Sequence, residues 1–233
     1  MTELFLKPDW PAPANVRALV TTRAFGNLAD HVGDEKSAVA ARRAALRQYL
    51  PAEPHWLSQV HGSRCVAAED APPGIEADAS FARSASQVCA VLTADCLPIL
   101  FCDAAGTVVA AAHAGWRGLL GGVIEATVGA MAVSPQHLLA WLGPAIGPAA
   151  FEVGEEVRIA FVADDPEAFS AFAARPDGKW LCDLYLLARQ RLARLGVIRV
   201  FGGGRCTHGE TALFYSYRRE RETGRMASLI WTV

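Results

Sequence analysis

Two histidines and one cysteine stand out because each follows an apolar segment whose end could face a shared site. His61 follows Ser-Gln-Val, Cys96 follows Val-Leu-Thr-Ala-Asp, and His113 follows a run of valines and alanines. Side chains gather into sites at strand ends of open sheets. Two imidazoles and a thiolate suit Zn²⁺ and could also bind copper. Three protein ligands with a fourth position open form the pattern of a catalytic zinc site.

The positions of these residues in the chain leave another interpretation open. They are too far apart to form a local motif, so each histidine could instead be a capping or core residue. The segment after His113 adds a second feature. Gly115 and Gly118 allow close backbone approach, and Gly118 is expected to precede a helix whose free amides favour an anion. Arg117 could bind phosphate or carboxylate, or it could be solvated in a tight strand-to-helix turn.

The composition is that of a globular protein. The chain has 233 residues, of which 52% are hydrophobic and 20% charged, with a net charge of −2. No basic field favours nucleic acid, and no polybasic patch or apolar run of about 18 residues favours a membrane. The N-terminal segment lacks the pattern of a signal peptide, so we expect a cytoplasmic protein. Six cysteines without a Cys-x-x-Cys pair are expected to be reduced thiols.

The hydrophobic pattern mixes strands and helices without strict alternation. We expect one α/β domain over residues 1–233, with mixed rather than all-parallel sheets. Strands are expected at residues 16–23, 54–62, 107–115 and 138–142, with two more in 87–103 and a final strand pair at 197–204 and 211–219. Helices are expected at residues 34–50, 118–131, 155–163 and 181–197. The turn-rich loop before residue 80 contains Asp78, for which we expect more than a loop role.

Eight segments in order resemble a known family. They are TTR, QVHG, LTADCLPIL, HAGWRG, WLGPAIGP, FEVG, FYSYRR and TGRMAS, and they run from about Val16 to the C-terminus. This set is similar to the YfiH-type family, often labelled laccase-domain or multicopper polyphenol oxidase. The resemblance implies a zinc ion held by His61, Cys96 and His113. It also implies a four-layer α/β/β/α fold of cysteine-hydrolase-like type.

The same resemblance implies a purine nucleoside phosphorylase acting on adenosine, inosine and S-methyl-5′-thioadenosine, with adenosine deaminase activity. Its partners would be a purine nucleoside and phosphate. The catalytic residues would be the three metal ligands, joined by Asp95 as a candidate acid or base, because the sequence lacks the usual zinc-deaminase signature. The candidates for binding phosphate are Arg23, Arg64, Arg117 and Arg225.

Three other functions stay open from the sequence. Cys96 and His113 could form the nucleophile and base of a hydrolase or amidase that acts on a cell-wall precursor. Copper-dependent polyphenol oxidation is a further alternative, although six histidines are too few for the usual multicopper array. A non-enzymatic scaffold is the last. The chain also departs from the family pattern by a short segment between TTR and HVGD, where members usually carry a longer loop.

Overall fold

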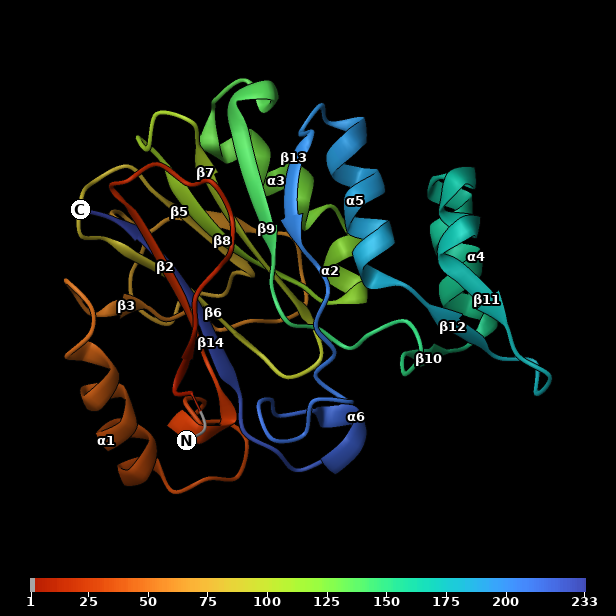
Figure 1. Cartoon of the computed structure of the whole chain (residues 1–233), viewed down its shortest axis with the longest axis horizontal. Helices are drawn as coiled ribbons and strands as arrows, with labels where there is room; N and C mark the ends of the chain where they lie inside the picture. Colours follow the sequence, from red (N-terminus) through yellow and green to blue (C-terminus); the bar gives the residue numbers. More distant parts are fainter. Residues whose placement is uncertain (1–2) are drawn as a thin grey trace.

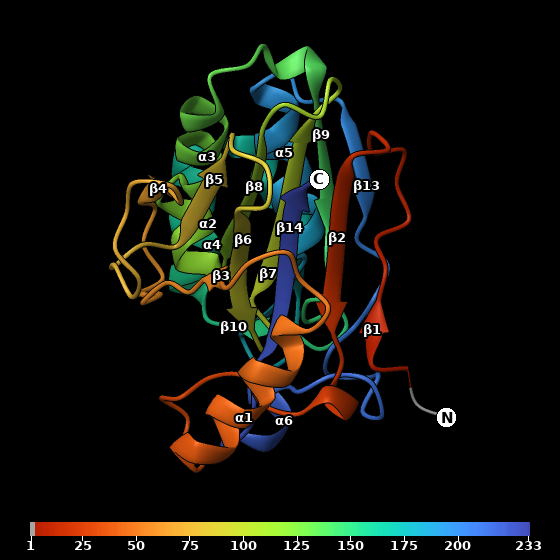
Figure 2. The same cartoon turned by 90° about the vertical axis from the view of Figure 1, so that its left-hand side faces the viewer.

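The computed structural model describes residues 3–233, and two mixed β-sheets packed on each other form its centre (Figures 1 and 2). In spatial order, the five-stranded sheet contains β1 (Phe5–Leu6), β2 (Val16–Thr21), β14 (Met226–Thr232), β6 (Val88–Thr93) and β3 (Pro54–His55). The six-stranded sheet contains β13 (Arg199–Gly202), β9 (Leu138–Leu142), β7 (Leu97–Asp103), β8 (Val109–Ala114), β5 (Ala79–Ala82) and β4 (Cys65–Ala67). Each sheet combines parallel and antiparallel pairs, which confirms the predicted mixed α/β fold.

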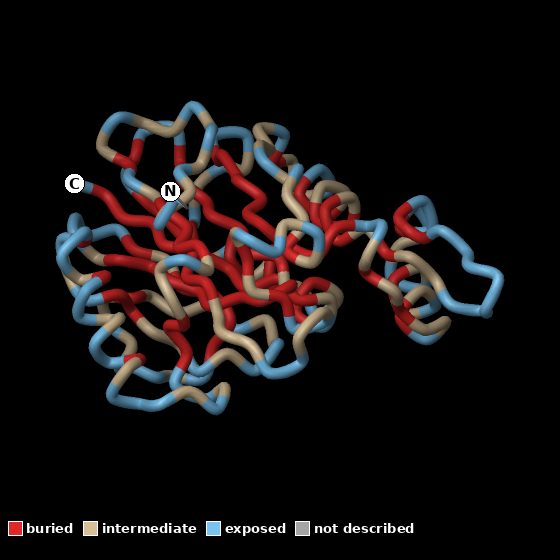
Figure 3. The backbone as a smooth tube through the Cα atoms, turned by 60° about the horizontal axis from the view of Figure 1, so that its bottom comes forward, coloured by how far each residue is buried: buried red, intermediate tan, exposed pale blue. Residues whose placement is uncertain are grey.

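One buried cluster lies between the two sheets, and a larger one lies between the six-stranded sheet and its helices. Val91 and Ile230 of the five-stranded sheet share one buried cluster with Leu100 and Ala111 of the six-stranded sheet. The strands β6, β7 and β8 are buried along their whole length. Their near-continuous apolar sequence is what a strand covered on both faces requires. In Figure 3 the buried backbone accordingly runs through the centre of the molecule.

Helices cover the outer faces of the two sheets. Leu46 of α1 (Lys36–Arg47) packs on the five-stranded sheet. The outer face of the six-stranded sheet packs against α2 (Trp116–Leu120), α3 (Val123–Met131) and α5 (Leu184–Arg194), and α4 (Glu155–Asp164) lies beyond them, against α2. A small sheet of β10 (Glu152–Val153), β12 (Trp180–Cys182) and β11 (Phe172–Ala174) projects from the body together with α4 (Figures 1 and 3).

The remaining elements are short. There are three 3-10 turns, η1 (Arg23–Phe25), η2 (Pro135–His137) and η3 (Pro166–Ala171), and one short helix, α6 (Tyr217–Glu220). Within residues 3–233, no helix has the length and apolar character needed to cross a membrane. All six cysteines are free thiols, as expected.

The predicted strand over residues 54–62 was wrong beyond its first two residues. Only Pro54–His55 forms a strand, and Val60 to Gly62 lie in a loop. The backbone N–H groups of Val60, His61 and Gly62 all donate to the carboxylate of Asp78 rather than to a neighbouring strand. A single side chain therefore replaces the ladder that the apolar pattern predicted.

Two other predicted elements differ from the structure: glycines interrupt a predicted helix, and a turn with a short helix replaces a predicted strand. The expected helix over 118–131 begins at Trp116 and breaks at Gly121–Gly122, where Gly122 has a φ of +89°. Gly118 therefore lies inside α2 instead of preceding a helix. The expected strand over 211–219 is a turn followed by α6, and β13 pairs with β9.

Candidate metal centre and substrate cavity

His61, Cys96 and His113 meet at one end of the six-stranded sheet. Their ligand atoms all lie within 4.8 Å of one another, and the two imidazole ring centroids are 4.8 Å apart. The antiparallel register of β7 and β8 places Pro98 opposite His113, so Cys96, just before β7, lies beside the end of β8. Cys96 is reached through a crossing from β6 to β7 between the two sheets, where Asp95 has a φ of +89°. The sheet register thus assembles the predicted trio.

Asp78 holds two of the three ligands. Its Oδ1 lies 2.8 Å from His113 Nδ1 and accepts the backbone N–H of His61 at 2.9 Å, while its backbone carbonyl accepts the N–H of His113 at 2.7 Å. Burial would raise the pKa of this carboxyl, but the hydrogen bond and charge of His113 hold it below its usual value. A carboxylate on Nδ1 leaves Nε2 free for a metal, which is the usual second contact of a metal-binding histidine.

Charges within the trio favour a thiolate. Burial would raise the pKa of Cys96, but the charge and hydrogen bond of His113, helped by His61, lower it to about 6. Burial would likewise lower the pKa of His113, yet the charge of Cys96 and the hydrogen bond to Asp78 raise it to about 9. The metal-free site therefore holds a thiolate beside an imidazolium at neutral pH. A thiolate is the form of cysteine that binds metals.

Two glycines after His113 allow this close packing. A Cβ on Gly115 would lie 2.8 Å from Cys96 Sγ and 3.2 Å from His61 Cδ2. A Cβ on Gly118 would lie 2.7 Å from the carbonyl oxygen of Gly62, in the loop that carries His61. The predicted close approach is therefore present, and what approaches these glycines is the metal-binding loop itself.

Replacing Gly115 with alanine is expected to weaken zinc binding at least tenfold, because the added methyl group displaces Cys96 and His61. Overpacking of this kind destabilises a protein by about 1–3 kcal/mol. The matched control is Gly129→Ala on α3, where an added Cβ meets nothing within 4 Å. Calorimetric zinc titration and thermal unfolding of both variants measure the effects. Zinc affinity of Gly115→Ala within twofold of wild type would refute this packing role.

A cavity of about 570 Å³ opens beside the trio, which is within the range of small-molecule sites. Its apolar walls come from β6, from the loop after β3, from α2, and from the segments that lead into and out of the projecting β10–β12 unit: Leu57, Leu92, Trp116, Ile146, Phe151 and Leu184. Thr93 lines the same cavity, and its buried Oγ1 has no hydrogen-bond partner within residues 3–233. The cavity can thus enclose a flat apolar group and offer polar contacts at its edge.

Two of the four arginines predicted to bind phosphate line the cavity, together with two arginines that were not predicted. Arg117 and Arg225 line it, as do Arg218 and Arg221 of the α6 segment. Arg23 and Arg64 are not among the lining residues. Arg23 pairs with Glu220 and lies over the Tyr215 ring, and Arg64 donates to the carbonyl oxygen of Glu76.

Arg225 is set apart from the other cavity arginines by its surroundings. Desolvation lowers the pKa of its guanidinium, although the nearby charges of Cys96 and Asp95 oppose this shift. Its Nη1 donates to the carbonyl oxygens of Thr223 and Gly224. Arg117 is exposed and stacks on Trp116, with its guanidinium carbon 4.3 Å from the ring centroid. One partly desolvated cation, Arg225, and one exposed cation, Arg117, thus line the cavity with the trio.

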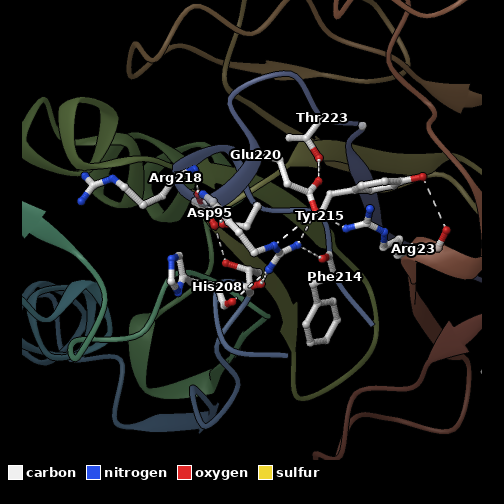
Figure 4. A network of polar contacts seen from close by, with 12 residues as sticks. Arg23, Asp95, His208, Phe214, Tyr215, Arg218, Glu220 and Thr223 are labelled. Carbon is white, nitrogen blue, oxygen red and sulfur yellow. Dashed lines mark hydrogen bonds and ion pairs between the residues drawn. The ribbon is translucent and has the colours of Figure 1, made fainter. Parts of the chain in front are cut away.

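Asp95 serves as an anchor in this structure. It is 8% exposed, and its carboxylate accepts hydrogen bonds from Thr207 Oγ1 at 2.6 Å, Ser216 Oγ at 3.1 Å and the backbone N–H of Arg218 at 2.6 Å. Figure 4 shows Asp95 joined to the segment around α6. The residue next to Cys96 thereby fixes the helix that contributes two cavity arginines.

Comparison with known proteins identifies the family. The sequence model of the family described as multi-copper polyphenol oxidoreductase laccase matches residues 20–233. The chain belongs to this family. A relative named purine nucleoside phosphorylase from Pseudomonas aeruginosa is 55% identical, covering 97% of this chain and 98% of its own. Purine nucleoside phosphorylase YfiH from Escherichia coli is 52% identical with the same coverage.

Solved structures share the fold. A Neisseria meningitidis protein is 52% identical with a TM-score of 0.95, covering 99% of each chain. YlmD from Geobacillus stearothermophilus is 29% identical with a TM-score of 0.90, covering 100% of this chain and 97% of its own. The family description names several copper ions, whereas the described residues provide one candidate metal site. Within residues 3–233, His61, Cys96 and His113 form the one group of three or more His, Cys, Asp or Glu residues close enough to hold a metal ion.

Sequence reasoning missed several residues of this laccase-family site. Arg218 lay in a segment expected to be a strand, and Arg221 lies directly after α6, where its φ is +60°. His31 lines the cavity from the segment between η1 and α1. Asp78 was expected to be more than a loop residue, but its three hydrogen bonds to His61 and His113 were not predicted.

Proposed function

We propose that the protein is a zinc-dependent purine nucleoside phosphorylase that acts on adenosine, inosine and S-methyl-5′-thioadenosine. The observation that carries the proposal is a His-Cys-His trio, oriented by Asp78, at the wall of a cavity that combines apolar sides with arginines. Relatives at 52–55% identity that bear the name purine nucleoside phosphorylase support it. The reduced thiols further support a cytoplasmic location.

The donor set fits zinc. Two imidazoles and one thiolate are ligands that Zn²⁺ prefers, and the buried carboxylate on His113 supplies the supporting contact that such sites use. Copper is the alternative for the same donors. A bound zinc ion supplies Lewis acidity and an open coordination position for water or substrate.

In this proposal the protein residues orient the metal ligands, bind phosphate and enclose the purine. Asp78 keeps the ring of His113 in one orientation and fixes the backbone of His61. Arg117 and Arg225 place positive charge beside the trio, where a phosphate dianion would attack the ribose. The apolar walls enclose the purine and exclude water, which strengthens these electrostatic contacts. In this proposal the arginines bind phosphate and the trio orients the reacting groups.

Adenosine deamination is the secondary activity in this proposal. It requires a group that moves protons near C6 of the purine. Asp95 is the one carboxylate that lines the cavity, and its oxygens accept three hydrogen bonds within the protein. We therefore propose deamination to be slower than phosphorolysis, because those contacts hold Asp95 in place.

Zinc-loaded protein incubated with inosine is expected to release hypoxanthine and ribose 1-phosphate only when phosphate is present. Omitting phosphate should lower release of the base at least tenfold, since phosphate is the nucleophile. Chromatography of the base and a phosphate-ester assay measure the two products. Zinc-loaded protein that leaves adenosine and inosine intact, or that releases the base equally without phosphate, would refute the proposal.

A cysteine-hydrolase function is the second candidate, and the order Cys96–His113–Asp78 favours it. These residues provide a nucleophile, a base and an orienting carboxylate, with the pKa of Cys96 lowered to about 6. The packing of helices outside two sheets is also compatible with the four-layer, cysteine-hydrolase-like arrangement implied by the sequence. An acylated Cys96 after incubation with a cell-wall precursor would support this candidate, and tight zinc binding would oppose it.

A further inference from the structure

The cavity carries more positive charge than one phosphate requires. Four arginines line it, and none of the four forms an ion pair with a carboxylate within residues 3–233: Arg117, Arg218, Arg221 and Arg225. The one carboxylate among the lining residues, Asp95, is fixed by hydrogen bonds. Unpaired arginines gathered at one cavity favour a ligand with several negative charges.

These cations fall into two pairs. Arg225 feels the charge of Cys96, and Arg117 follows Gly115, which packs against Cys96 Sγ, so both belong to the metal side. Arg218 and Arg221 come from the other wall, on and directly after α6, and both are exposed. One pair is sufficient for the phosphate of the proposed reaction, which leaves the charge of the α6 pair for a second anionic group.

The three arginines of the α6 segment, Arg218, Arg219 and Arg221, have different surroundings. Arg219 is half-buried, and its guanidinium donates to the carbonyl oxygens of Thr207, His208 and Phe214 and pairs with Glu220. Arg218 lies three residues before Arg221, and both line the cavity. The segment is anchored to Asp95 through the backbone N–H of Arg218 and the hydroxyl of Ser216. The guanidinium of Arg218 donates to the carbonyl oxygen of Glu152 at 2.8 Å, whereas that of Arg221 has no partner within residues 3–233. The α6 segment therefore presents one held and one unpaired cation to the cavity.

We propose that Arg218 and Arg221 form a second anion subsite, which binds the 5′-phosphate of a purine nucleoside 5′-monophosphate. The inference rests on the proposed function, because it places the purine near the trio and inorganic phosphate on Arg117 and Arg225. The cavity volume of about 570 Å³ is large enough for a ligand of this size. The monoester would then bridge from the apolar walls to α6, and it acts as a competitor of the nucleoside or as an alternative substrate.

The test compares inosine with inosine 5′-monophosphate by calorimetric titration of the zinc-loaded protein. We expect the monophosphate to bind about tenfold more tightly than inosine. Arg221→Gln should lower this ratio of affinities about tenfold, because the guanidinium of Arg221 forms no hydrogen bond or ion pair within residues 3–233, and its backbone N–H donates to Tyr217 in either variant. Ribose 5-phosphate and inorganic phosphate, titrated separately, distinguish a monoester subsite from a general phosphate site.

Arg17→Gln is the matched control. Arg17 also lacks a carboxylate partner, contacts only nearby carbonyl oxygens and does not line the cavity, so its substitution should leave the ratio unchanged. A monophosphate that binds no more tightly than inosine, or a ratio equal in Arg221→Gln and wild type, would overturn the inference. An effect equally strong with inorganic phosphate alone would overturn the monoester assignment.

The two proposals can fail separately in this experiment. Phosphorolysis of inosine without preferential binding of the monophosphate refutes the subsite alone. Preferential, Arg221-dependent binding without phosphorolysis refutes the reaction and upholds the subsite. Failure to bind either compound refutes both.

Discussion

Replacing Cys96 with serine is expected to abolish stoichiometric zinc binding and to lower phosphorolysis by about 10³-fold or more. A serine hydroxyl stays protonated at neutral pH, so the site loses the anionic ligand that the pKa of about 6 provides in Cys96. A thousandfold loss corresponds to about 4 kcal/mol of transition-state stabilisation, which is within what a catalytic metal contributes. Zinc per protein by mass spectrometry and the rate of base release measure the two effects.

Cys206→Ser is the matched control for this substitution. Cys206 is also a half-buried free thiol, but its Sγ accepts N–H groups from Gly147 and Gly209, and it does not belong to the trio. This variant should keep wild-type zinc content and rate. Full activity in Cys96→Ser with zinc still bound would contradict the assignment of the ligand.

Alkylation separates the metal role of Cys96 from a nucleophilic one. In metal-free protein the Cys96 thiolate should react readily with iodoacetamide, and added zinc should protect it. Equal alkylation with and without zinc would favour the hydrolase candidate, because a metal-bound thiolate is not a free nucleophile.

Replacing Asp78 with asparagine is expected to weaken zinc binding about 10–100-fold, the range found when the second contact of a metal-binding histidine is lost. Asparagine has nearly the same shape, but its amide must face N–H donors from His61 and Gly62 and from the ring of His113. An unsatisfied buried polar group costs about 1–3 kcal/mol of stability. Competition with a chelator and denaturant unfolding measure both changes.

Asp103→Asn separates the loss of orientation from general destabilisation. Asp103 is also buried, and it accepts hydrogen bonds from Thr107 and Val108 at the opposite end of β7 from Cys96. It should lose comparable stability and keep its zinc affinity. Equal zinc affinities in the two variants would show that Asp78 has no orienting role.

The sequence was sufficient to predict candidate site residues where they adjoin a long apolar strand. Cys96 and His113 adjoin β7 and β8, whose uninterrupted apolar runs made both strands predictable, and their register then brings the two residues together. The mixed sheets followed from strands and helices that do not alternate. The same signal failed for His61, because a single buried carboxylate replaced strand pairing around it.

The rest of the site depends on contacts between distant parts of the chain. The α6 segment has the apolar and aromatic residues of a strand, yet Asp95, more than a hundred residues earlier, captures its backbone. Local propensity carries no information about such a partner. Arg23 and Arg64 illustrate the reverse case, since each looked like a phosphate ligand and each has a partner elsewhere in the structure.

Titration of metal-free protein with zinc, with the rate of inosine phosphorolysis recorded at each addition, tests whether the trio holds the metal needed for the reaction. We expect a rate that rises linearly and stops rising at one zinc per chain, since the described residues hold one candidate metal-binding trio. Full phosphorolysis in protein shown to be free of metal, or a rate that is unaffected by zinc, would contradict it.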